Sequence, residues 1–231
     1  MAPKQSSKES QIQSALFRNV MADYILQWGF VVIVTARTPG AHERGFEAAQ
    51  KLEEHMGADP DGIDRIEIGL PVLHLRGADF DTARKAFVQW VRDYEEAEEE
   101  GWTSDVRNDS FILLDGPALN SVLEGDLDTA WVNVIDAHPP SEEERPGYPG
   151  WMRCKTRALA KLCEDIDVDD DGLPGRCPAR DHVGQIPLFD GTPGGRLLET
   201  EGPAQDGIVD PPKGTRRSAR IGSRKNATAA K

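Results

Sequence analysis

The sequence has no long apolar run, few cysteines and few aromatic residues. No segment approaches the ~20 consecutive apolar residues of a membrane-spanning helix. Residues 1–10 are polar and lack the apolar stretch of a secretory signal. The three cysteines, Cys154, Cys163 and Cys177, are an odd number and favour free thiols over a disulfide framework. We therefore expect a soluble, intracellular protein that binds no membrane.

The short motifs of common enzyme classes are also missing. The chain has no G-x-S-x-G nucleophile elbow, no P-loop, no G-x-G-x-x-G after a strand, no H-E-x-x-H and no C-x-x-C. This absence favours a non-catalytic binding or interaction module over an enzyme. The long charged segments favour an unidentified protein as its partner. No cofactor follows from the sequence, and calcium is an alternative that we do not favour.

Basic residues are scarce in the body of the chain and concentrated in its tail. Residues 211–231 hold seven of the 27 Lys and Arg residues and no Asp or Glu, so residues 1–210 carry 20 cations against 40 carboxylates, a net charge of -20. Such an acidic body repels phosphates and argues against nucleic-acid binding on its main surface. The basic tail 213–225 is the exception, as a candidate polyanion-binding arm or nuclear-import signal. The alternative is a disordered terminus whose cations contact the acidic body. We expect a cytoplasmic protein, with the nucleus as the alternative.

A short apolar run, Phe30–Val34, is the strongest structural signal in the chain. Its length and its lack of polar alternation predict a strand buried on both faces, as at the centre of an α/β sheet. Further apolar runs at 70–76, 111–114 and 130–135 alternate with segments of helical spacing. This alternation predicts an α/β fold with a single sheet of about four strands, largely parallel and flanked by helices. An α+β sandwich with a mixed sheet is the alternative.

The composition changes along the chain and predicts four regions. Residues 1–8 are expected to be disordered, and residues 9–140 to form the α/β core domain. Residues 141–200 are expected to hold a linker, one helix at 151–165 and an irregular segment laid over the domain. Residues 201–231 are expected to be a disordered basic tail.

Polar residues follow each predicted strand, where ligands bind in parallel sheets. They are Thr35 and Arg37, then Arg76, then Asp115, and finally Asp136 and His138. One alternative function is therefore an enzyme that uses Asp115, Asp136 or His138 as acid–base groups. In that case Thr35, Arg37 and Arg76 would bind an anionic ligand. The competing interpretation is that Asp115 shapes a turn and the others are solvated strand-end residues.

Asp167, Asp169 and Asp171, followed by Gly172, match the opening of an EF-hand calcium loop. The twelfth position of that loop is Pro178, where a bidentate Glu is needed, so a solvated acidic loop is the favoured interpretation. A weak calcium site at 167–172 is the second alternative function. The cysteines and His182 are ligand types for zinc, but they lack the close pairing of a structural zinc site.

Three apolar landmarks occur along the chain. They are Trp28-Gly29-Phe30, the segment Phe111-Ile-Leu-Leu-Asp115, and the segment Trp131-Val-Asn-Val-Ile-Asp136. In this order the chain resembles a family of uncharacterised small fungal α/β proteins, over about residues 15–140. That family has no assigned activity, so the resemblance implies a fold and no site.

Overall fold

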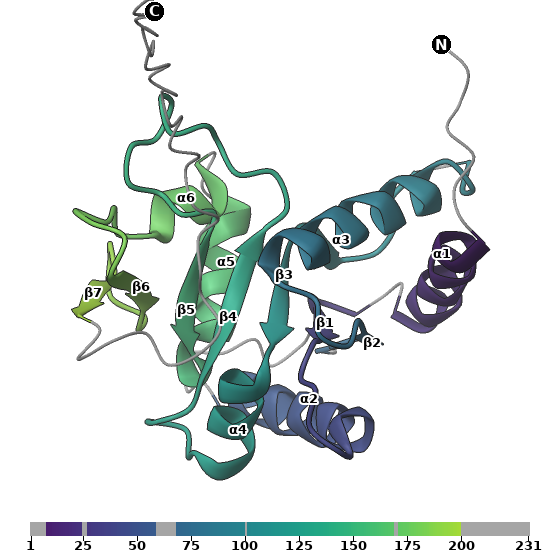
Figure 1. Cartoon of the computed structure of the whole chain (residues 1–231), viewed down its shortest axis with the longest axis horizontal. Helices are drawn as coiled ribbons and strands as arrows, with labels where there is room; N and C mark the ends of the chain where they lie inside the picture. The colour runs from purple at the N-terminus through teal and green to yellow at the C-terminus, as the bar shows by residue number, and fades with distance from the viewer. Residues whose placement is uncertain (1–7, 25–26, 59–67, 100, 169–170, 200–231) are drawn as a thin grey trace, which may run out of the picture. The chain divides into compact units, whose positions relative to one another are not determined.

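The computed structural model describes residues 8–24, 27–58, 68–99, 101–168 and 171–199 (Figure 1). The segments expected to be disordered, 1–8 and 201–231, lie outside these ranges apart from Lys8, the first residue of helix α1. The basic tail 213–225 is therefore outside them too. Within the described ranges, no helix combines the length and the hydropathy of a membrane span.

The described strands form one mixed sheet, in the order β2-β1-β3-β4-β5-β6-β7. They are β1 (Gly29–Val34), β2 (Val72–His74), β3 (Val106–Leu114), β4 (Trp131–Asp136), β5 (Trp151–Lys155), β6 (Gln185–Phe189) and β7 (Arg196–Glu199). β1 pairs parallel with β2 and with β3, and β5 pairs parallel with β6. The pairs β3–β4, β4–β5 and β6–β7 are antiparallel.

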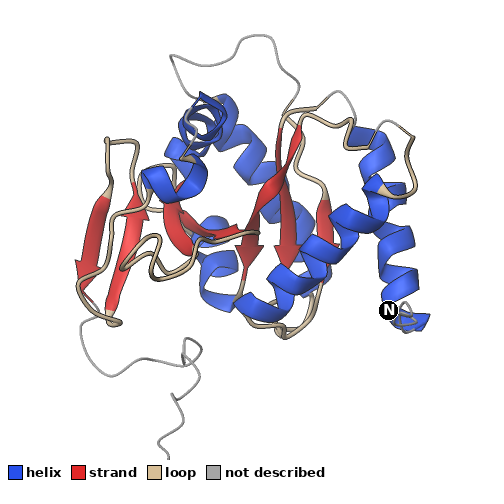
Figure 2. Cartoon of the chain, turned by 90° about the horizontal axis from the view of Figure 1, so that it is seen from above, coloured by secondary structure: helices blue, strands red, loops and turns tan. Residues whose placement is uncertain are grey.

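Helices pack against both faces of this sheet (Figure 2). They are α1 (Lys8–Met21), α2 (Ala41–Gly57), α3 (Phe80–Glu95), α4 (Gly116–Glu124), α5 (Leu159–Val168), α6 (Gly172–Arg176) and the 3-10 turns Ala22–Tyr24 and Thr156–Ala158. Phe30, Val32 and Val34 pack with α2, α4 and α5 on one face. Val31 and Ile33 pack with α1 and α3 on the other, because successive strand residues point to opposite faces. The prediction that Phe30–Val34 is a strand buried on both faces is confirmed.

The prediction of one sheet with about four largely parallel strands is wrong, because the sheet has seven strands of mixed direction. The first error lies at β4. A parallel crossover must return the chain along the full length of β3, whose nine residues extend about 30 Å. The nine residues of α4 rise only about 13 Å, so β4 starts from the end where β3 finishes.

The second error concerns residues 151–199, which we expected to contain one helix and irregular chain. Trp151–Lys155 forms β5, and helical structure starts only after it. β6 and β7 then extend the sheet beyond β5 (Figure 1). The charged residues Arg153 and Lys155 hide the strand pattern in the sequence, and hydrogen bonding to β4 decides the conformation.

Candidate functional site

Strand direction decides which of the predicted site residues share an edge of the sheet. β1, β2 and β3 run parallel, so Thr35, Arg37, Arg76 and Asp115 lie at the edge formed by their carboxyl ends. β4 runs the opposite way. Asp136 pairs with Ser110, four residues before the end of β3, which places it about 13 Å from that edge. Asp136 and His138 therefore do not join the other four residues.

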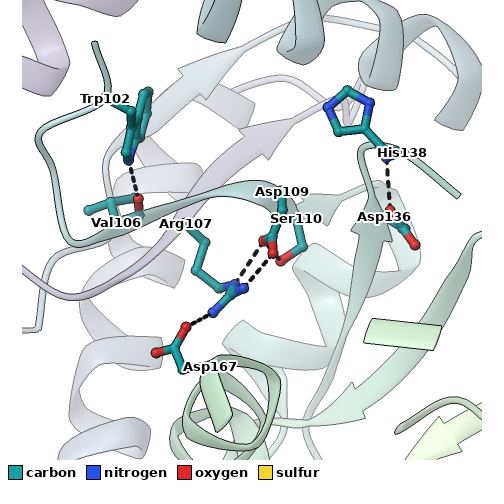
Figure 3. A network of polar contacts seen from close by, with 8 residues as sticks. All are labelled: Trp102, Val106, Arg107, Asp109, Ser110, Asp136, His138 and Asp167. Carbon is teal, nitrogen blue, oxygen red and sulfur yellow. Dashed lines mark hydrogen bonds and ion pairs between the residues drawn. The ribbon is translucent and has the colours of Figure 1, made fainter. Parts of the chain in front are cut away.

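Asp136 anchors the loop that follows β4. It is 7% exposed, and its carboxylate accepts a hydrogen bond from the His138 backbone N–H at 2.8 Å (Figure 3). The Tyr148 hydroxyl donates a second hydrogen bond to it, also at 2.8 Å. Arg84 donates to the Asp136 carbonyl at 2.8 Å. Burial raises the pKa of Asp136, and these hydrogen bonds oppose that rise. His138 is exposed and meets Asp136 through its backbone.

Asp115 starts helix α4. Its side chain accepts a hydrogen bond from the Ala118 backbone N–H at 2.9 Å, as an N-cap does. Burial raises the pKa of Asp115, while this bond, the charge of Arg153 and the side chain of Asn133 lower it. Arg153 in turn lies 3.7 Å from the ring centroid of Trp131. The geometry agrees with the interpretation that Asp115 shapes a turn.

The loops after β1 and β2 are tied together through Thr35, Arg37, Arg76 and Gly77. The carbonyl of buried Thr35 accepts from the Gly77 N–H at 2.7 Å. The Arg37 guanidinium donates to the Gly77 carbonyl at 3.1 Å, and that of Arg76 donates to the Arg37 carbonyl at 3.2 Å. Gly77 has a φ of +76°, so the turn favours glycine, and a Cβ there would meet Arg37 Nε at 2.5 Å and displace that side chain.

A cavity of about 270 Å³ lies beyond the carboxyl ends of β1 and β2. We call it the β1–β2 pocket. Its walls are the loop after β1, the first turn of α2 and the end of β2. Its ionisable side chains are His42, Glu43, His74 and Arg76. Of the predicted residues, Arg76 alone lines it; Arg37 lies beside it, and Thr35 is buried.

His74 is held against α2 with one ring nitrogen unsatisfied. Its ring centroid lies 4.2 Å from that of His42 and 5.7 Å from that of Phe46. His74 Nε2 is buried and has no hydrogen-bond partner among the described residues. Burial lowers the pKa of His74, the nearby His42 lowers it further, and Glu43 opposes the change. The imidazole is therefore neutral near pH 7.

Gly45 explains why α2 can approach the strands so closely. A Cβ at Gly45 would lie 2.7 Å from Val34 Cγ2 and 3.1 Å from His74 Cε1. Glycine therefore lets the helix rest directly on β1 and on the His74 ring. This contact fixes the distance between the two walls of the β1–β2 pocket.

Arg37 and Arg76 are the cations that follow β1 and β2 at this edge. Among the residues that the structure describes, neither Arg37 nor Arg76 forms an ion pair. Helix α2 also begins at Gly40 without a side-chain cap, so its positive end faces the same region. The edge can therefore attract an anionic group, in a chain whose net charge is -13.

The predicted calcium residues are placed differently. Asp167 forms an ion pair with Arg107, which also pairs with Asp109 (Figure 3). Asp169 lies outside the described residues, and Asp171 precedes α6 at its N-cap position. In the described ranges, no cluster of three or more His, Cys, Asp or Glu side chains could hold a metal ion.

The three cysteines are free and buried. Burial raises the pKa of each thiol, that of Cys177 to about 12. The thiols are therefore protonated at neutral pH and are poor nucleophiles and metal ligands.

No protein-family model, curated protein or solved structure matches this chain. The resemblance to a fungal family stays a prediction. Neither His42 nor His74 was among the site residues predicted from the sequence. One sequence signal was present: His42 follows Pro39-Gly40 at the start of the helix after a buried strand, where a first helical turn faces a strand-end site.

Proposed function

We propose that the protein is a non-catalytic binding module that takes a small anionic ligand, carrying a phosphate or carboxylate group, in the β1–β2 pocket. The observation that carries this proposal is that an arginine without an ion pair and an imidazole without a hydrogen-bond partner, both judged among the described residues, line one pocket. Arg76 has no ion-pair partner among the described residues, and His74 Nε2 has no hydrogen-bond partner among them. A bound anion would give Arg76 a partner of opposite charge.

The size and position of the pocket support a small ligand. A cavity of about 270 Å³ is slightly smaller than the ~300–1,000 Å³ of most ligand-binding pockets. It lies outside the carboxyl ends of two parallel strands, where ligands bind in sheets of this kind.

The acid–base residues predicted from the sequence do not line this pocket, which favours binding over the predicted catalysis. Asp115 caps α4, and Asp136 is buried at the other end of β4 in hydrogen bonds to His138 and Tyr148. Neither carboxylate lines the β1–β2 pocket. Catalysis by Asp115 or Asp136 would need that carboxylate within hydrogen-bond reach of the ligand.

Isothermal titration of the full chain with inorganic phosphate, and separately with acetate, tests the proposal. Arg76→Gln removes a charged hydrogen bond worth roughly 1.5–3 kcal/mol, so the Kd should rise about tenfold or more. Arg92→Gln changes an exposed arginine on α3 that does not line the pocket, and it is the matched control. Equal losses in both variants, or no binding of either anion at millimolar concentration, would contradict the proposal.

A further inference from the structure

A second cavity, of about 330 Å³, lies at the same edge of the sheet. We call it the β5–β6 pocket, because its walls include the segments that follow β5 and β6. β5 and β6 are parallel to each other, and β5 runs in the direction of β3, since both are antiparallel to β4. The lining residues are His55, Ala58, Leu127, Asp128, Arg157, Ala158, Lys161, Asp190 and Gly191.

The cations of this pocket already have carboxylate partners. Arg157 pairs with Asp128 at 2.8 Å, and the two side chains are 48% and 75% exposed. Lys161 pairs with Asp165 at 3.1 Å, outside the lining. The pocket therefore contains both signs of charge side by side.

The two other ionisable residues of the lining, Asp190 and His55, contact polar groups of the protein. Asp190 accepts from the Thr192 hydroxyl at 2.6 Å and pairs with Arg196 at 3.2 Å. These contacts lower the pKa of Asp190 and keep it ionised, and the hydrogen bond from the Thr192 hydroxyl has the largest effect. His55 Nδ1 lies 2.8 Å from Oγ1 of the buried Thr156. Burial and the charge of Lys51 lower the pKa of His55. Its ring is therefore uncharged near pH 7 where it lines the pocket.

We propose that the β5–β6 pocket binds a small zwitterion of the amino-acid class, with the ligand carboxylate on Arg157 and the ligand ammonium on Asp128. This is a second site with a different ligand class from the proposed function. An exposed ion pair such as Arg157–Asp128 contributes only about 0–1 kcal/mol, so a ligand can separate its members at little cost. A zwitterion replaces that one pair by two new pairs and leaves no charge uncompensated.

Ligands of a single charge fit this arrangement less well. A simple anion on Arg157 would displace Asp128 and leave it unpaired, close to Asp190 in the same lining. A simple cation on Asp128 would leave Arg157 unpaired beside Lys161. Arg157 can also hold a carboxylate through two parallel hydrogen bonds, which favours the carboxylate end of an amino acid over a halide ion. Leu127 and Ala158 supply an apolar surface for a short side chain.

Isothermal titration of the full chain with L-alanine, propionate and ethylamine tests this inference, because the last two each keep one of the charges of alanine. We expect alanine to bind at millimolar concentration, with propionate and ethylamine at least tenfold weaker at this pocket. Arg157→Gln and Asp128→Asn should each weaken alanine at least tenfold. Both residues are partly or largely exposed, so both variants should keep the melting temperature of the parent chain.

A control separates this site from the β1–β2 pocket, which can also take a carboxylate. Arg76→Gln should leave alanine binding unchanged while weakening phosphate. The inference is overturned if alanine produces no heat, if propionate binds as tightly as alanine in the Arg76→Gln background, or if Arg157→Gln keeps full alanine affinity. Loss of phosphate binding alone overturns only the proposed function.

Discussion

The two pockets share one edge of the sheet and one helix, yet their charges are arranged in opposite ways. His42 in the first turn of α2 lines the β1–β2 pocket, and His55 near the end of α2 lines the β5–β6 pocket, about 20 Å further along the helix. Arg76 in the first pocket has no ion pair among the described residues. Arg157 in the second pocket is already paired with Asp128.

The comparison suggests a rule: whether a cation forms an ion pair in the unliganded protein decides which class of ligand it binds well. An unpaired cation gains a new partner from any accessible anion. A paired cation gains little from a simple anion, because its former partner is then left without a counter-charge. In the two proposals, arginine at a strand end therefore binds a different ligand class in each pocket.

The strongest way to break both pockets together is to remove packing under the helix that they share. Leu52 of α2 is fully buried, and Leu52→Ala should lower the free energy of unfolding by about 2–5 kcal/mol. Phosphate and alanine binding should then weaken together in the variant. Gln50→Ala, at an exposed position of α2, is the control and should change stability by less than about 0.5 kcal/mol. Urea unfolding and titration check both effects, and loss of only one ligand would show that α2 is not a common support.

A more selective change should disturb the β1–β2 pocket alone. Gly45→Ala places a Cβ within 2.7 Å of Val34 Cγ2, so the helix must move away from β1 and His74. Overpacking of this kind costs about 1–3 kcal/mol. Phosphate binding should fall, while alanine binding at the far end of α2 should persist.

Gly57→Ala is the matched control for that change in the same helix. A Cβ at Gly57 would meet only Ile68 Cδ1, at 4.0 Å, which is ordinary contact. Alanine has the higher helix propensity by up to about 1 kcal/mol, so this variant should be neutral or slightly more stable in thermal unfolding. Equal destabilisation by the two substitutions would remove the role assigned to Gly45.

Acid should lower the stability of the fold through a histidine from each pocket. Burial lowers the pKa of His74 and of His55 below the ordinary value of 6.5, so the unfolded chain binds more protons than the folded chain as pH falls through that value. The stability these groups contribute is complete above pH 6.5 and declines from there toward their folded pKa values. Urea unfolding between about pH 7.5 and 5.5 measures this slope.

Single substitutions assign the slope to the two pockets. His74→Gln and His55→Gln should each reduce it in part, and the double variant should reduce it most. A double variant with the parent slope would contradict the assignment. Asp115 and Asp136 have raised pKa values, so they act in the opposite direction at lower pH and are unchanged in these variants.

The smallest expected effect concerns the ion pair in the β5–β6 pocket. Arg157→Gln should change the free energy of unfolding by less than about 1 kcal/mol, and added salt should reduce even that difference. Chemical denaturation at low and high ionic strength checks it. A loss of several kcal/mol would mean that the pair holds the fold and is not free to exchange with a ligand.

The sequence identified one half of the sheet better than the other, for a physical reason. Phe30–Val34 has a composition that only a doubly covered strand explains, and its parallel neighbours place Thr35, Arg37, Arg76 and Asp115 at one edge. The direction of β4 follows from the short length of α4 relative to β3, and the alternation of strand and helix patterns alone does not take that length into account. Asp136 and His138 were therefore assigned to the wrong edge.

The pockets themselves depend on tertiary contacts that local patterns do not show. His74 lines a pocket because α2 folds across the end of β2, and Gly45 permits that approach. The β5–β6 pocket is lined by segments between residues 55 and 191 that lie far apart in the sequence. Short strands with charged residues, such as Trp151–Lys155, are difficult to recognise from the sequence, so the pocket that they help to form is not predicted.

Amide chemical-shift mapping by NMR, with phosphate and L-alanine titrated separately into the full chain, tests the central claim most directly. The account predicts that phosphate shifts signals of residues 38–43 and 74–76, and that alanine shifts signals of residues 127–128, 157–161 and 190–191. Arg76→Gln should abolish the first pattern and Arg157→Gln the second, with no cross-effect. If both ligands shift the same residues, or each arginine variant removes both patterns, the claim of two pockets with different charge requirements is contradicted.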